Sequence, residues 1–342
     1  MKKKNKNSPN MAVSADRRRM RLLETQRVVI QAEKLLCGPL ITYWNSRNGE
    51  ICDEDTEALR TLLSAMPFTK RLFLCLTSTG GNGLASLRIA NLLRKHCESL
   101  VVLVPTCAAS AATMIALAAD EIWLAPHANL SPVDTKIHHA LAPVNQTNDQ
   151  VGVGQDELTR IIALWRKESK GSPSNPYAAL WPYIHPLVVG AVDRANSLSL
   201  KLCDALMSFH ISNAALRTKI ATMLTREYPA HGYPIMLSEA RRIGIPAKEM
   251  KPNIEKVLSD LQRYYVEAGK QNRIDTDQDH HHDYELTAIA ERKGRMVFFR
   301  LDRDWYYRAE ERRWLPMNAS KDGWYAVELH KGMTIEKRLH IQ

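Results

Sequence analysis

One serine of this chain lies where a nucleophile would be exposed. Ser110 follows an apolar, β-branched run at Leu100–Val104 and is flanked by alanines, and a helical apolar pattern then continues as far as Asp120. This order predicts a buried strand, a tight turn and a helix that begins beside the serine. The positive end of that helix favours nearby anions, and the small neighbours leave room for a carbonyl group. The segment therefore meets the requirements of a serine nucleophile.

A pair of glycines follows the preceding predicted strand. Gly80 and Gly81 come after the apolar run 71–77, and the helical pattern Leu84–Cys97 follows them. Glycines after a strand let backbone N–H groups point into a pocket, and together with the Ser110 turn they suit an oxyanion hole. An ordinary strand-to-helix turn also contains glycine. A catalytic site is favoured because the glycine loop and the Ser110 turn follow two successive predicted strands.

Three ordered blocks resemble the serine dehydrogenase proteinase family. They are residues 77–81, 108–134 and 228–246. That family is a branch of the ClpP and crotonase superfamily, which also contains signal-peptide-peptidase-like serine proteases. The resemblance covers roughly residues 35–250. It implies an α/β fold, a ClpP/crotonase-like spiral of ββα units with extra helices.

The resemblance also implies a Ser-His-Asp triad. Ser110 matches the family's nucleophile, Asp134 its acid and His231 its base. In such a triad the histidine takes the serine proton and returns it to the leaving group, while the aspartate fixes the imidazole tautomer. No metal and no cofactor are expected. The predicted oxyanion hole consists of backbone groups at Gly80, Gly81 and Ala111.

Other interpretations of these residues stay open from the sequence. Ser110 is small enough to serve helix packing alone, Asp134 lies where a turn or helix cap would fit, and His231 lies in a loop rich in proline and glycine. Signal-peptide peptidases use a lysine base, which must be desolvated to lose its proton. The competing bases are Lys136, Lys167, Lys170, His127, His138, His139 and His185.

Charge is concentrated at the start of the chain. The 342 residues carry a net charge of +10, and eight basic residues against one acidic residue give residues 1–21 a charge of +7. Such an arm is typical of proteins that bind an anionic partner, either a lipid surface or a nucleic acid. It is equally typical of a tail that only keeps the protein soluble. No apolar run reaches the ~20 residues of a membrane span, and no apolar region of a signal peptide follows the basic start. Six scattered cysteines without CxxC spacing indicate reduced thiols and a cytoplasmic protein.

Four segments are predicted along the chain. Residues 1–36 form a basic arm and a helix (16–36) whose apolar face is available to another subunit, and 37–250 form the ClpP/crotonase-like serine protease domain. Residues 251–283 form a helix and a polar linker that contains a His/Asp run, better suited to a linker than to a metal site. Residues 284–342 form a small, aromatic-rich antiparallel β module, with strands at Met296–Leu301, Trp305–Ala309, Arg313–Met317 and Trp324–Leu329 and turns at 302–304 and 321–323.

The leading functional hypothesis is a serine hydrolase, a peptidase that cleaves polypeptide through Ser110. By resemblance, a homo-oligomer is expected. The alternative is a non-catalytic crotonase-fold scaffold that binds a protein or nucleic acid through its basic arm and aromatic module. A weaker third hypothesis is an acyl-CoA enzyme, because crotonases use the same oxyanion geometry.

Overall fold

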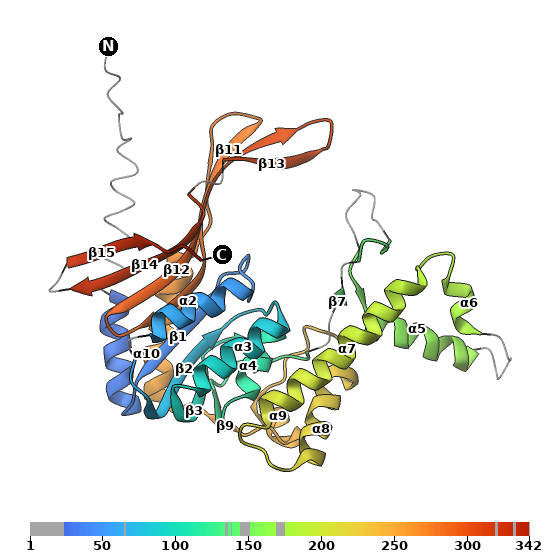
Figure 1. Ribbon diagram of the computed structural model, residues 1–342, viewed down its shortest axis with the longest axis horizontal. Helices are drawn as coiled ribbons and strands as arrows, with labels where there is room; N and C mark the ends of the chain where they lie inside the picture. Colours follow the sequence, from blue (N-terminus) through green and yellow to red (C-terminus); the bar gives the residue numbers. More distant parts are fainter. Residues whose placement is uncertain are drawn as a thin grey trace.

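The chain folds around one large mixed sheet with helices packed against it (Figure 1). The computed structural model describes residues 24–64, 66–133, 136–137, 139–143, 151–168, 175–318, 321–330 and 333–341. Half of the sheet is parallel, and its apolar strands are largely buried, as expected for strands covered on both faces. In spatial order these strands are β1 (Leu40–Asn45), β2 (Thr69–Thr77), β3 (Cys97–Val104), β5 (Glu121–Leu124) and β9 (Ala247–Glu249).

The C-terminal strands continue the same sheet. β1 pairs antiparallel with β11 (His280–Arg292), and β12 (Arg295–Arg308), β14 (Gly323–His330) and β15 (Met333–Arg338) follow in order. β10 (Asn272–Asp275) pairs with β11, and β13 (Arg313–Asn318) pairs with β12, where this part of the sheet extends away from the main body (Figure 1). Antiparallel strands are therefore present in this region, but the predicted strands Met296–Leu301 and Trp305–Ala309 are parts of one strand, β12. The pairing of β1 with β11 makes these strands part of the main sheet.

Helices and short strands surround the parallel half. Helix α4 (Ala111–Leu117) is buried along its whole length, and α3 (Gly83–Arg94) lies between it and α2 (Asp53–Leu63). Two small sheets pair β4 (Cys107–Ala108) with β6 (Asn129–Leu130) and β7 (Lys136–Ile137) with β8 (Val153–Gly154). The other helices are α5 (Gln155–Glu168), α6 (Pro176–Leu180), α7 (Pro186–Met207), α8 (Ala214–Thr222), a π-helix (Met223–Glu227), α9 (Leu237–Ile243) and α10 (Pro252–Ala268).

Two segments predicted as linker and turn are strands. His280–Asp283 begin β11, and residues 302–304 lie inside β12. The charged side chains there find partners across the sheet, which stabilises the ladder. His282 Nδ1 lies 2.8 Å from Asp304 Oδ1. Among the described residues, no three His, Cys, Asp or Glu side chains gather as metal ligands would.

The N-terminal helix packs on this chain's own core. The structure describes residues 24–36 of it, and Val29, Ala32 and Leu36 belong to the main hydrophobic cluster. These three side chains are thus covered within the chain and are not available to another subunit. Leu35 of the predicted face is exposed, and Leu22 and Leu23 lie outside the described residues. The basic arm, residues 1–21, lies outside the described residues.

A buried carboxylate ties this helix to the sheet. Glu291 of β11 is fully buried and accepts hydrogen bonds from Thr25, Gln26 and Tyr265, the last at 2.6 Å. Tyr265 of α10 also lies 2.8 Å from the Thr42 hydroxyl of β1. Burial raises the pKa of Glu291 to about 7 from 4.5, although these three donors lower it. The carboxyl group therefore holds a proton in the folded chain at a pH where the unfolded chain has lost it.

This proton makes stability depend on pH. As pH rises from about 4.5 to about 7, the unfolded chain binds fewer protons than the folded one, so the free energy of unfolding falls by about 3 kcal/mol. Glu291→Gln removes the titration and is expected to lessen that fall. Urea denaturation at pH 5 and pH 8 measures the effect as the difference between wild type and variant, which cancels other groups such as Asp55. Equal pH dependence in both proteins would contradict the prediction.

Candidate active site

Ser110 occupies a strained turn at the start of α4. Its φ is 52° and its ψ is −116°, a conformation that glycine adopts far more readily than serine. Strain of this kind persists only where the surroundings impose it, and it gathers at functional sites. A serine in such a strand-to-helix turn presents its hydroxyl outward, as a nucleophile elbow does. The Ser110 side chain makes no capping hydrogen bond to α4.

The first of the two glycines packs directly against this turn. Gly80 and Gly81 have φ values of 116° and 142°, and a Cβ added to Gly80 would lie 2.7 Å from the Ser110 Cβ. The Gly80 N–H donates to Ser78 Oγ at 3.1 Å, and the Gly80 carbonyl accepts from the Ile51 N–H at 2.8 Å. Because the Gly80 amide is engaged, Gly81 and Ala111 are the better N–H donors for an oxyanion. Ala111 opens α4, and the first amides of a helix lack intrahelical acceptors.

A cavity of about 450 Å³ brings the predicted residues together. Ser110, Ala111, Gly81 and His231 all line it, although His231 is more than a hundred residues from the serine in the chain. His231 is half-buried, in a turn after the π-helix. Its segment is held by Ile235, which exchanges two backbone hydrogen bonds with Leu130. The rest of the lining combines polar residues with an apolar group: the polar residues are Glu50, Asn82 and Ser199, and the apolar ones are Leu84, Met114, Val133, Ala195, Leu198 and Leu202.

The residue before the predicted acid belongs to this lining. Val133 lines the cavity and its N–H donates to the Leu224 carbonyl at 2.9 Å, and Asp134 is the next residue. Asp134 itself lies outside the described residues. The same is true of His138 and Lys170, and of the side chain of Lys136.

Three of the competing bases have other positions. Lys167 is exposed on α5. His139 and His185 accept backbone N–H bonds from Leu141 and Leu187 at 3.1 and 3.2 Å, so they serve as turn and helix caps. None of the three lines the cavity of Ser110.

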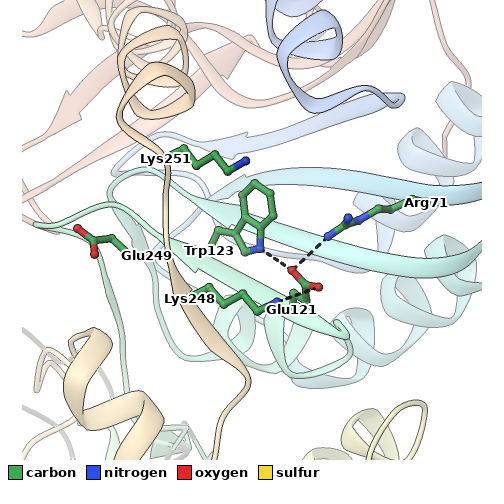
Figure 2. A pocket seen from close by; sticks show the side chains of 6 residues that line it. All are labelled: Arg71, Glu121, Trp123, Lys248, Glu249 and Lys251. Carbon is green, nitrogen blue, oxygen red and sulfur yellow. Dashed lines mark hydrogen bonds and ion pairs between the residues drawn. The ribbon is translucent and has the colours of Figure 1, made fainter.

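A second hollow, at the opposite ends of the strands, is held by its own ion pairs. Figure 2 shows Glu121 between Arg71, Trp123 and Lys248, with contacts of 3.1, 2.8 and 3.1 Å. Partial burial would raise the pKa of Glu121, but the hydrogen bonds and the two cations lower it. Arg71 lies near the start of β2, whereas Ser110 follows the carboxyl end of β3. Ligands of parallel sheets bind at carboxyl ends, which favours the cavity of Ser110 over this hollow as the ligand site.

The family comparison agrees with this geometry. Residues 47–160 match the ClpP-like SDH-type serine proteinase family. The matched range contains both glycines, Ser110 and Asp134, while His231 lies beyond it. The resemblance inferred from the sequence and the ClpP-like α/β fold class are thereby confirmed, and the family is one of serine proteinases.

Similar proteins of known sequence include two uncharacterized proteins of Methanocaldococcus jannaschii. MJ0137 is 27% identical over 220 residues, 64% of this chain and 66% of that protein. MJ1495 is 26% identical over 213 residues, 62% of this chain and 63% of that protein. The chain thus spans slightly less than two thirds of the length of these curated relatives.

Two solved structures are also similar to the chain. A mutant of the 1510-N membrane-bound stomatin-specific protease is 14% identical, with a TM-score of 0.37, covering 68% of this chain and 84% of that one. A mutant of ClpP1 from Listeria monocytogenes is 16% identical, with a TM-score of 0.32, covering 63% and 94%. In the described part of this chain, no helix has the length and apolar character to cross a membrane.

Some residues of the site were not predicted from sequence. Ser78, Thr113 and Ser131 are buried hydroxyl residues that bond to the backbone of the two turns. Nothing in their local pattern distinguishes them from ordinary core residues. Helix α7 contributes one wall of the cavity, and its apolar periodicity predicts burial without indicating what it faces.

Proposed function

We propose that this protein is a serine peptidase in which Ser110 attacks the carbonyl carbon of a peptide bond. The observation that carries the proposal is the strained, positive-φ turn of Ser110 in a cavity that His231 also lines. Strain at a turn costs stability, and a packing role for a small residue gives no reason to maintain it. The match to a serine proteinase family supports the same reaction.

In the proposed mechanism His231 is the general base. It takes the proton of the Ser110 hydroxyl as the oxygen attacks, and it then gives that proton to the leaving amine as the peptide C–N bond breaks. Water, activated by the same histidine, hydrolyses the acyl-enzyme and releases the carboxylic acid. Asp134 is proposed to hold the imidazole in the required tautomer. A lysine base is disfavoured at Lys167, because an exposed ammonium group keeps its proton.

The N–H groups of Gly81 and Ala111 are proposed to stabilise the tetrahedral intermediate. Both residues line the cavity beside Ser110. Donors fixed in advance where the negative charge develops supply a large part of catalysis in acyl transfer. Gly80 has a different role, because its own N–H already donates to Ser78. Without a side chain, it lets the glycine loop lie close to Ser110.

The proposed substrate is a polypeptide with an uncharged side chain beside the cleaved bond. Met114, Leu198 and Leu202 form an apolar wall, and a charged side chain packed against that wall would lose its hydration at a cost. The homo-oligomer and the cytoplasmic location stay predictions. So does an anionic partner of the N-terminal arm.

Leu198→Asp tests this specificity. Leu198 is partly exposed on α7 and lines the cavity, so a carboxylate there is expected to raise KM for peptides with apolar side chains about tenfold. Leu187→Asp is the matched control, because Leu187 is exposed on the same helix and is not part of the lining. Peptide libraries cleaved by wild type and both variants measure the effect. An equal change of KM in both variants would show that Leu198 does not contribute to substrate binding.

The proposed function is tested by covalent labelling with a fluorophosphonate. The probe reacts with serines that a neighbouring base activates, and mass spectrometry of the digested protein identifies the modified residue. Labelling at Ser110 that is lost in the heat-denatured protein and in His231→Ala would support the proposal. Folded protein that cleaves no peptide and takes up no probe at Ser110 would reject it.

A further inference from the structure

We propose that Ser131 is a positioning residue that holds Ser110 in its strained conformation. This inference rests on the proposed role of Ser110 as nucleophile. Ser131 follows β6 and is almost fully buried, and its Oγ accepts the Ser110 N–H at 2.8 Å. The same Oγ donates to the Pro132 carbonyl at 2.9 Å. The hydroxyl therefore both donates and accepts, and its position beneath Ser110 is fixed.

A second buried hydroxyl holds Ser131 in place. The Ser131 N–H donates to Thr113 Oγ1 at 3.1 Å, and Thr113 Oγ1 donates to the Ala108 carbonyl at 2.7 Å. Thr113 belongs to α4 and Ala108 to β4, the two elements that flank Ser110. The two side chains thus connect the residue after β6 to both sides of the turn. Buried hydroxyls in a fully bonded chain fix backbone positions well, because each lost bond leaves an unsatisfied group.

Ser131 differs from the other residues that bond to this turn because it contacts the N–H of Ser110 itself. Ala109 donates its N–H to the Ser78 carbonyl at 2.9 Å, and Met114 donates to the Ser110 carbonyl at 3.1 Å. The first bond fixes the residue before Ser110, and the second fixes the Ser110 carbonyl, so neither acts on the N–H of Ser110. Among the described residues, the Ser131 hydroxyl is the acceptor for the N–H of Ser110 itself. The orientation of that peptide group sets φ at Ser110 and with it the direction of the side chain.

The same segment also connects to the proposed base. Leu130 precedes Ser131 and exchanges backbone hydrogen bonds of 3.0 and 2.9 Å with Ile235, four residues after His231. Ser131 therefore joins the turn that carries the nucleophile to the segment that carries the base. Loss of its hydroxyl is expected to alter how well the two groups are aligned, and small misplacements of reacting groups reduce rates strongly.

The test compares three substitutions of Ser131 with a matched control. Ser131→Ala removes the acceptor, Ser131→Cys keeps the shape with a weak sulfur acceptor, and Ser131→Thr retains the hydroxyl. Thr42→Val is the control, because Thr42 is also fully buried and hydrogen-bonded but lies on β1 near Tyr265. The readouts are kcat and KM with an apolar peptide, thermal stability, and the crystallographic φ of Ser110 in Ser131→Ala or, if that variant does not fold, in Ser131→Cys.

We expect kcat to fall on the order of 10- to 100-fold in the Ala and Cys variants, with KM changed less than about threefold and with rescue by Thr. Ser110 should leave the positive-φ region in the crystal. Thr42→Val should lose stability without this fall in kcat. Ala and Cys variants with wild-type kcat and an unchanged φ at Ser110 would overturn the inference. If the wild type itself shows no Ser110-dependent hydrolysis, the proposed function fails, and the φ of Ser110 in the variant crystal alone decides the positioning role.

Discussion

Ser110→Ala is expected to abolish peptide hydrolysis, with kcat reduced on the order of 10⁴-fold or more. In the proposed mechanism the serine oxygen forms the acyl bond. Among the hydroxyl side chains described in the cavity, that of Ser110 is the one that lies in a strained turn beside the proposed amide donors. His231→Gln is expected to cause a similar loss. The double variant should be no worse than either single one, because the two groups act as a unit. Progress curves with a fluorogenic peptide measure all three proteins.

Substitution of Ser110 by glycine distinguishes the effect on catalysis from the effect on stability. The backbone of Ser110 lies at φ 52° and ψ −116°, which glycine adopts without the steric cost that a Cβ brings. Ser110→Gly should therefore be as inactive as Ser110→Ala but more stable than that variant, by about 1 kcal/mol. Thermal denaturation of the two variants checks this. Equal stability would mean that the turn is unstrained, and full activity in either variant would remove Ser110 from the mechanism.

The parallel half of the fold was well predicted from sequence because its signals are local. Buried strands such as β3 read as continuous apolar runs, and helix α10 shows its buried face directly in the spacing of Ile254, Leu258, Leu261 and Tyr265. The predicted end of α3 at Cys97 was wrong, since the helix ends at Arg94 and Cys97 opens β3. Helix ends are weakly marked where no glycine or proline follows.

The C-terminal strands show where local signals fail. Residues 302–304 resemble a turn because they are charged, yet they continue β12, since Asp322 accepts the Asp302 N–H at 2.8 Å and pairs with Arg303. Partners twenty residues away cannot be identified from composition. For the same reason the pairing of β11 with β1 was not predicted. A contact between strands distant in sequence leaves no local periodicity.

The sequence motifs of the candidate site were predicted, but the buried residues that hold these motifs in place were not. Ser110 and the glycines occupy turns with a distinct sequence, and His231 was assigned through the family resemblance. Ser131 and Thr113 act through hydrogen bonds to backbone groups, and such bonds are common for buried hydroxyls. Gly80 was also predicted to belong to the oxyanion hole. Only the structure shows that its N–H donates to Ser78, because this hydrogen bond leaves no signal in the sequence.

Gly80→Ala is expected to inactivate the protein although Gly80 carries no side chain. An added Cβ would lie 2.7 Å from the Ser110 Cβ and 3.0 Å from the Ala109 carbonyl oxygen. Both atoms belong to the turn itself, so relief requires the turn to move away from the glycine loop. The φ of 116° is also unfavourable for alanine. We expect a loss of about 2–4 kcal/mol in stability and a fall in kcat of at least about 100-fold.

Gly190→Ala provides the matched control for this substitution. Gly190 lies in α7, and an added Cβ there would have no atom within 4 Å, so the change should be neutral or stabilise the helix by up to about 1 kcal/mol. Gly269→Ala gives a second comparison, because its Cβ would lie 2.3 Å from the Trp44 ring, and Gly269 is not part of the Ser110 cavity. If close approach to Ser110 governs catalysis, a folded Gly80→Ala protein should lose more kcat per unit of lost stability than Gly269→Ala. Wild-type kcat and stability in Gly80→Ala would show that the glycine loop does not pack on the Ser110 turn.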